Sequence, residues 1–235
     1  MAVNKAALSA LGRQIDYQFN NTALLDEALT HRSVGARNNE RLEFLGDSIL
    51  NFVIADALFK LYPDLREGDL SRLRASLVNG ESLAQIARGL GLGDCLNLGG
   101  GELRSGGHRR SSILADCVES LIGAVYCDSG FERSRELVLR LYRDKLQNIP
   151  DPQSLKDPKT RLQELLQARK HALPHYEVIN VSGKAHQQEF EVQCRIDDPA
   201  VLTTAIGSSR RKAEQLAAER AIEQLLPLLG KSGNG

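Results

Sequence analysis

The spacing of apolar residues changes character along the 235-residue chain. Over residues 1–149 apolar positions recur three and four residues apart, which is typical of amphipathic or buried helices. After residue 157, short runs of β-formers lie between Gly, Asp and Pro, which predicts strands. The expected helices cover 22–30, 39–61, 68–78, 82–90, 112–127, 131–146, 160–169 and 209–226, and the expected strands cover 176–181, 189–196 and 201–206.

Three prolines fall within the polar segment 148–159, where they remove backbone donors and disfavour helix. The segment therefore predicts a boundary between two domains. We expect an all-α domain, a linker, a small α+β domain with the order α-β-β-β-α, and a flexible tail. Their expected ranges are 1–149, 150–156, 157–228 and 229–235.

Composition narrows the class of protein. Hydrophobic residues make up 42% and charged residues 26%, as in ordinary globular proteins. No apolar run approaches the roughly 20 residues of a membrane helix, and the N-terminus does not resemble a secretory signal. Four cysteines without a C-x-x-C pair fit free thiols in a cytoplasmic protein. Because the net charge is zero, binding to nucleic acid would depend on where the charges lie.

Two of the predicted helices carry acids on stripes that are otherwise apolar. Glu40, Glu43 and Asp47 fall within an arc of about 60° on the first helix. Asp116 and Glu119 are the charged residues of a second helix that is apolar nearly all round and should be buried. Like charges repel one another and burial penalises the ionised form, so these acids need partners.

One shared site would satisfy four acids at once. The acids of the two helices would face each other around divalent cations, because carboxylate oxygens suit Mg²⁺ and Mn²⁺. Such cations polarise a phosphodiester and lower the pKa of a coordinated water. Alternatively, each acid is a solvated residue or an ion-pair partner, for example of Arg41; this accounts poorly for four acids on two apolar helices. The four acids are Glu43, Asp47, Asp116 and Glu119.

These segments resemble the motifs of a known family. Glu-Arg-Leu-Glu-Phe-Leu-Gly-Asp at 40–47 resembles the signature of the ribonuclease III family. Leu-Ala-Asp-Cys-Val-Glu-Ser-Leu-Ile-Gly at 114–123 resembles its second acidic motif. The resemblance covers almost the whole chain. It implies an all-α catalytic and dimerisation domain followed by a double-stranded RNA-binding domain.

The resemblance also implies roles for individual residues. The catalytic metals, Mg²⁺ with Mn²⁺ as a substitute, would be bound by Glu43, Asp47, Asp116 and Glu119. Asp47 and Glu119 would be the most critical for catalysis. Glu40 and Glu67 would support the site, and Phe44 would insert into the partner subunit of a homodimer. The sequence does not depart from the family pattern at any of these acids.

The last predicted helix begins against the usual helix electrostatics. Ser208 or Ser209 is a suitable N-cap, yet the first turn that follows contains three cations. The helix dipole favours anions at this end, whereas a phosphate would suit both the dipole and the cations. These cations are Arg210, Arg211 and Lys212.

The other elements of the C-terminal module also suit a reader of duplex RNA. His186 lies in a turn between two strands, and a face of the preceding helix offers hydrogen-bonding side chains for 2′-hydroxyls. Each element alone is more typical of a solvated basic face, whereas the elements together, at these spacings, favour RNA binding. The strands carry no aromatic pair for stacking single-stranded bases. From 157 to 226 the chain resembles a double-stranded RNA-binding domain, and the helix face comprises Thr160, Gln163 and Glu164.

The glycine-rich segment 99–110 contains three arginines and a histidine. Glycines allow close approach of backbone and arginines suit phosphate. A plain surface loop and a contact with RNA account for it equally well. These residues are Arg104, His108, Arg109 and Arg110.

Three functions follow from these patterns. The first is an endoribonuclease that cleaves double-stranded RNA, with 5′-phosphate and 3′-hydroxyl ends and short 3′ overhangs implied by the resemblance. Its implied substrates are ribosomal RNA precursors and structured messenger and transfer RNAs. The second is an RNA-binding scaffold without cleavage, which has no use for the costly acids. The third is another metal-dependent phosphohydrolase acting on nucleotides, which has no use for the C-terminal module.

Overall fold

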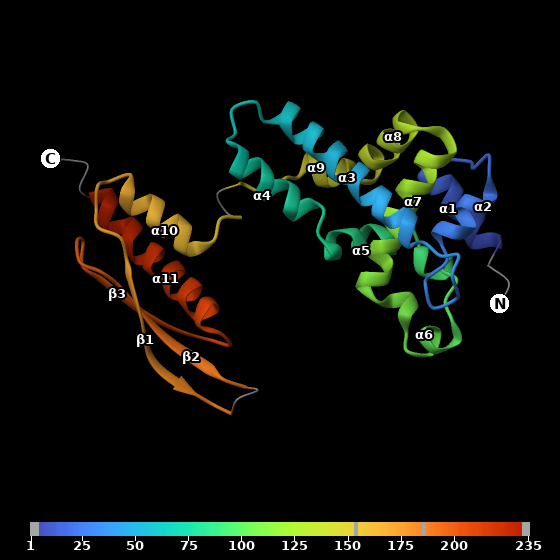
Figure 1. Ribbon diagram of the computed structural model, residues 1–235. Coiled ribbons are helices and arrows are strands. Elements are labelled where there is room, and N and C mark those ends of the chain that lie inside the picture. The colour runs from blue at the N-terminus through green and yellow to red at the C-terminus, as the bar shows by residue number, and fades with distance from the viewer. Residues whose placement is uncertain (1–4, 153–154, 185–186, 232–235) are drawn as a thin grey trace. The chain divides into compact units, whose positions relative to one another are not determined.

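The computed structural model describes residues 5–152, 155–184 and 187–231. The chain forms two compact units, residues 1–152 and 153–235. In the first unit helices pack on one another, and in the second a three-stranded sheet is accompanied by two helices (Figure 1). The predicted fold class, an all-α domain followed by a small α+β domain, is confirmed.

The helices of the first unit are joined by short connections. Short 3₁₀ turns, η1 and η2, precede and follow α6. In chain order the elements are α1 (Lys5–Ile15), α2 (Thr22–Ala28), α3 (Glu40–Leu61), α4 (Glu67–Leu77), α5 (Gly80–Gly89), η1 (Leu92–Asp94), α6 (Gly100–Arg104), η2 (Gly107–Arg109), α7 (Ser111–Ser129), α8 (Phe131–Leu141) and α9 (Arg143–Gln147).

In the first unit the structure differs from the expected elements at three places. Helix α1 forms where no helix is expected, and the buried Leu11 and Ile15 hold it on the domain. The short α6 and η2 form inside 99–110, where a loop is expected. The helix expected over 131–146 divides into α8 and α9 at Tyr142, a fully buried residue.

Helix α7 is the centre of the first unit. It is buried along most of its length, as its nearly all-apolar surface predicts, and packs against α2, α3, α5 and α8. Glycines let α3 and α7 cross in backbone contact. A Cβ atom at Gly46 would lie 1.7 Å from the carbonyl oxygen of Glu119, and one at Gly123 would lie 2.2 Å from that of Leu42. The crossing fixes the relative positions of the two acid-bearing helices.

The turn between α2 and α3 is held by a segment distant in sequence. Thr30 forms a parallel bridge with Asn97. The His31 backbone N–H donates to the Asn97 carbonyl at 3.0 Å, and the Asn39 N–H donates to that of Thr30 at 2.9 Å. The Ser120 hydroxyl on α7 donates to the Ala28 carbonyl at 2.8 Å. The turn is therefore placed beside the start of α3 by tertiary hydrogen bonds.

The second unit is a three-stranded antiparallel sheet with strand order β1-β2-β3. Helix α11 packs against β2, β3 and α10. Strand β3 alternates strictly between buried and exposed residues, which is typical of a sheet with one covered face. The elements are α10 (Pro158–Gln167), β1 (His175–Ser182), β2 (Glu189–Ile196), β3 (Val201–Gly207) and α11 (Arg210–Lys231).

Both ends of this unit extend beyond their expected limits. Lys156, expected in the linker, has a buried side chain whose Nζ lies 2.6 Å from a carboxylate oxygen of Glu164. Helix α11 continues through Pro227 to Lys231, into the segment expected to be a tail. Leu229 packs against the core of the unit, and this apolar contact stabilises the additional helical turn.

No helix within the described ranges is both long and apolar enough to span a membrane.

Candidate functional site

The crossing of α3 and α7 brings three acids of the predicted site together. Glu43 lies on α3, and Asp116 and Glu119 lie on α7. One carboxylate oxygen from each lies within 4.8 Å of the others, and all three side chains are half-buried. The cluster therefore combines close spacing with partial removal from water.

The electrostatics of this cluster favour a cation. Burial, with added repulsion from Asp47, Glu43 and Asp116, raises the pKa of Glu119 to about 8. Burial and the charge of Asp116 raise the pKa of Glu43. Burial also raises the pKa of Asp116, although His31 and Arg32 oppose the shift. The raised pKa values mean that too little positive charge lies nearby to balance the three ionised carboxylates.

The donor set fits a divalent metal. Among the described ion pairs, none joins Glu43, Asp116 or Glu119 to a lysine or arginine. Three converging carboxylates offer hard oxygen ligands, which suit divalent cations such as Mg²⁺ and Mn²⁺. A bound divalent cation would supply the positive charge that the protein does not.

The remaining predicted residues of the catalytic domain lie outside this group of three. Asp47 is exposed one turn further along α3, and its Oδ1 accepts a hydrogen bond from Asn51 Nδ2 at 2.7 Å. Glu40 is exposed and pairs with Arg32 at 3.5 Å. Glu67, the first residue of α4, accepts from the Ser71 hydroxyl at 2.8 Å. The expectations for Asp47, Glu40 and Glu67 stay predictions.

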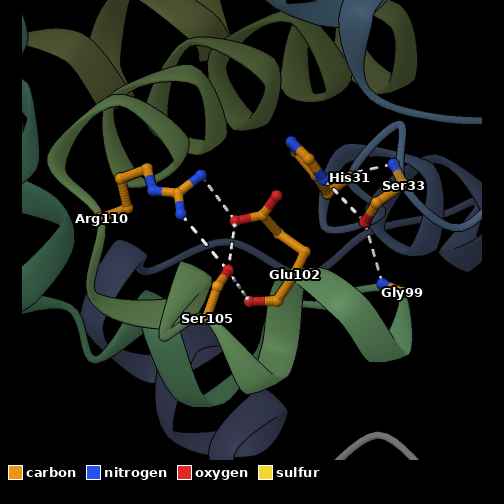
Figure 2. A network of polar contacts seen from close by, with 6 residues as sticks. All are labelled: His31, Ser33, Gly99, Glu102, Ser105 and Arg110. Carbon is orange, nitrogen blue, oxygen red and sulfur yellow. Dashed lines mark hydrogen bonds and ion pairs between the residues drawn. The ribbon is translucent and has the colours of Figure 1, made fainter.

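A cavity of about 510 Å³ opens beside the acids. Sequence reasoning missed the part of its wall that comes from the turn after α2, although a His-Arg-Ser run just before the acidic helix is a visible polar signal. Glu102 and Arg110 come from the segment 99–110 on another side (Figure 2). The cavity is lined by His31, Arg32, Ser33, Asn39, Glu40, Glu43, Glu102, Arg110, Ser112, Ile113 and Asp116.

The arginines around this cavity are engaged with carboxylates. Arg110 lies 2.6 Å from Glu102 and donates to the Ser105 hydroxyl at 3.3 Å, as Figure 2 shows. Arg32 pairs with Glu40. The segment 99–110 is thus a folded wall of the cavity, with Arg104 and Arg109 exposed.

In the second unit, the start of α11 is capped as expected. The Ser209 hydroxyl accepts from the Lys212 backbone N–H at 3.2 Å. Arg211 and Lys212 are exposed, whereas Arg210 Nε donates to the buried Glu214 at 2.9 Å. The cations at this helix end therefore divide into two that are solvated and one that is paired.

The predicted helix face on α10 is also on the surface. Thr160 and Gln163 are exposed, and Glu164 pairs with Lys156. Lys159 pairs with Glu214 at 2.6 Å, which links α10 to α11. His186 lies outside the described residues, so its expected contact with RNA stays a prediction.

Comparisons with known proteins agree with both units. Residues 21–146 match the family described as Ribonuclease-III-like, and residues 158–225 match the double-stranded RNA binding motif. The chain is 60% identical to Ribonuclease 3 of Alkalilimnicola ehrlichii, with 92% of this chain and 95% of the relative covered. It is 58% identical to Ribonuclease 3 of Vibrio vulnificus, with 93% and 97% covered.

A solved structure supports the first unit separately. The nuclease domain of ribonuclease III from Campylobacter jejuni matches with a TM-score of 0.57 and 43% identity, covering 61% of this chain and 97% of that one. Fold and site together define a two-domain protein that joins a helical domain with an acidic cluster to a double-stranded RNA-binding module. The chain belongs to the ribonuclease III family.

Proposed function

We propose that this protein is an endoribonuclease that hydrolyses double-stranded RNA with divalent metal ions. The observation that carries the proposal is the half-buried cluster of Glu43, Asp116 and Glu119, in a chain that also has a double-stranded RNA binding motif. A scaffold that only binds RNA would not need these acids, whose ionised forms are unfavourable without a cation. The relatives named Ribonuclease 3 support the same activity.

The acids on α3 and α7 would hold the metal ions, Mg²⁺ with Mn²⁺ as a substitute. Asp47 would join Glu43, Asp116 and Glu119 after a side-chain rotation that releases Asn51, since its charge already acts on Glu119. When bound, divalent ions polarise the phosphodiester and activate water for attack. The close α3–α7 crossing keeps the carboxylates in position, and Glu40 and Glu67 support the site.

We assign the 5′-phosphate and 3′-hydroxyl ends, and the short 3′ overhangs, on the family resemblance. The same resemblance supports ribosomal RNA precursors and structured messenger and transfer RNAs as substrates, and therefore a cytoplasmic site of action. A long, perfectly paired RNA incubated with and without Mg²⁺ tests the proposal. Discrete short duplexes should form with Mg²⁺, while the matching single strand stays intact. Retarded but uncut duplex would point to a binding scaffold instead.

We propose that two copies of the chain associate through α3. Phe44, Phe52 and Phe59 are 78%, 59% and 69% exposed and fall within an arc of about 80° on this helix. Large apolar side chains this exposed on one face mark an interaction surface. The solved nuclease domain of ribonuclease III from Campylobacter jejuni is described as structurally flexible in a region involved in dimer formation. A two-fold dimer would supply one acid cluster for each RNA strand.

Replacing Phe44 with alanine should weaken the dimer. Burial of one phenylalanine contributes about 1.5–3 kcal/mol, and two-fold symmetry doubles the loss, so the dimer Kd should rise at least about a hundredfold. Sedimentation velocity over a dilution series measures this. Leu173→Ala, which removes an exposed apolar side chain from the second unit, is the control. An unchanged dimer in the Phe44 variant would contradict the predicted insertion.

We expect Arg211 and Lys212 to bind phosphates of the duplex. Replacing both with alanine should lower the affinity for duplex RNA and reduce the slope of log K against log salt by about two, because each phosphate contact releases counterion. Arg195→Ala, on the uncovered face of β2, should leave the slope unchanged. Binding measured in EDTA at several salt concentrations separates the effect from cleavage. An unaltered slope in the double variant would exclude these contacts.

A further inference from the structure

His31 and Asn39 line the cavity beside the acids, and neither belongs to the acidic cluster. His31 comes from the turn after α2, and Asn39 lies at the start of α3. Glu43 and Asp116 line the same cavity. Within the described ranges, neither His31 Nε2 nor Asn39 Nδ2 forms a hydrogen bond.

The hydrogen bonds of His31 fix which ring nitrogen carries the proton. The Ser33 backbone N–H donates to His31 Nδ1 at 3.2 Å, so Nδ1 is an acceptor. The Ser33 hydroxyl lies 2.8 Å from the same nitrogen and itself accepts from the Gly99 N–H at 2.9 Å. Its proton is therefore free to point at Nδ1, and these contacts assign the proton of the neutral ring to Nε2. Figure 2 shows this second nitrogen pointing away from Ser33.

Asn39 carries an unpartnered donor in a buried position. The residue is 2% exposed, and Nδ2 has no hydrogen-bond partner among the described residues. The side chain does not cap α3 either. A buried amide without a partner lowers stability, so a native protein that keeps one calls for an explanation such as a ligand.

We propose that His31 Nε2–H and Asn39 Nδ2–H donate hydrogen bonds to a non-bridging oxygen of the RNA phosphodiester that enters this cavity. The inference rests on the proposed function and adds two substrate-contacting residues to it. Amide and imidazole N–H donors suit a site beside carboxylates, because they form ion pairs with an acid less readily than an arginine does. The cavity's arginines are captured in this way, Arg32 by Glu40 and Arg110 by Glu102. Preorganised donors stabilise negative charge on a reacting oxyanion.

Two substitutions at His31 separate its two nitrogens. In His31→Gln the amide nitrogen replaces Nε2–H, whereas in His31→Asn the amide reaches only the position of Nδ1. We expect His31→Gln to keep kcat within about fivefold of the parent and His31→Asn to lower it about a hundredfold with little change in KM. Equal kcat values for the two variants, whether both high or both low, would overturn the proposal.

Asn39→Leu provides a second test. It replaces the unpartnered amide with an apolar group of similar size, so the free protein should keep or increase its Tm. The same variant should lose cleavage rate about tenfold or more while binding duplex RNA normally in EDTA. A purely structural residue would lower Tm and activity together. That result, or full activity, would overturn the assignment for Asn39.

The ring proton of His31 can be observed in the full-length protein without metal or RNA. Recorded at a pH at which the imidazole is neutral, a long-range ¹H–¹⁵N spectrum should show the ring proton on Nε2, and a ring proton on Nδ1 would overturn the inference. Cleavage by the parent protein serves as the reference in every assay. If the parent does not cut duplex RNA, the proposed function fails; if the parent cuts and His31→Asn cuts equally well, only this inference fails.

Discussion

Gly46→Ala is expected to abolish cleavage of duplex RNA and to destabilise the first unit strongly. The new Cβ would lie 1.7 Å from the carbonyl oxygen and 2.6 Å from the carbonyl carbon of Glu119, and 2.9 Å from the Gly123 nitrogen. Those atoms belong to the α7 backbone, so no side-chain rotation relieves the clash. The two helices must separate at the point where they bring the acids together.

The free energy of unfolding should fall by about 3 kcal/mol, the upper end of the range for overpacked cores, which corresponds to a fall in Tm of roughly 6–12 °C. Calorimetry and a duplex-cleavage assay measure the two effects. Gly89→Ala is the matched control, because a Cβ at this position in α5 meets nothing within 4 Å. Alanine there should raise stability by about 0.5–1 kcal/mol. A Gly46 variant that keeps both Tm and activity would contradict the argument that this crossing sets the site.

The acids of the candidate site could be predicted from the sequence, because carboxylates on an apolar helix are unfavourable unless a cation binds them. Asp116 and Glu119 stand out as the charges on an otherwise apolar helix, and the structure places them with Glu43. Helical spacing gives the face on which Asp47 lies, but the direction of its carboxylate depends on its rotamer. In the structure Asn51 holds that carboxylate away from the group of three.

The residues that form the cavity wall could not be predicted from the sequence in the same way. Apolar residues do not recur at regular spacing in the turn that carries His31. The position of this turn is set by the bridge between Thr30 and Asn97, which are 67 residues apart. Glycine at position 46 is likewise visible in the sequence, but its contact with Glu119 depends on how two helices cross. Local pattern predicted the elements and the acids, whereas their long-range contacts required the structure.

Glu119→Gln is expected to have the largest effect on catalysis and an opposite effect on stability. If Glu119 is a metal ligand, as proposed, its loss removes several kcal/mol of metal-dependent stabilisation of the transition state, so cleavage in Mg²⁺ should fall at least about a thousandfold. The amide is nearly isosteric with the acid, and the second unit is untouched. Binding of duplex RNA in EDTA should therefore remain close to that of the parent.

The sign of the stability change follows from the pKa of Glu119, which burial raises to about 8 in the folded protein. Between the ordinary glutamate pKa near 4.5 and about 8, the folded state holds a proton that the unfolded state has lost. The stability of the metal-free parent should therefore fall as pH rises through this window and then level off. After allowance for solvent screening of this half-buried group, the loss is on the order of 2 kcal/mol.

Glutamine does not ionise, so the metal-free Glu119→Gln protein should be more stable than the parent at pH 8, while the two should be similar near pH 4.5. Added Mg²⁺ should raise the Tm of the parent at pH 8 but change that of the variant much less, because binding to the folded state stabilises it by mass action. Thermal unfolding of the parent and of the variant, at both pH values and with either EDTA or Mg²⁺, measures these differences in stability. If the variant were less stable than the parent at pH 8 without metal, Glu119 would be a structural acid with a partner rather than a ligand awaiting a cation.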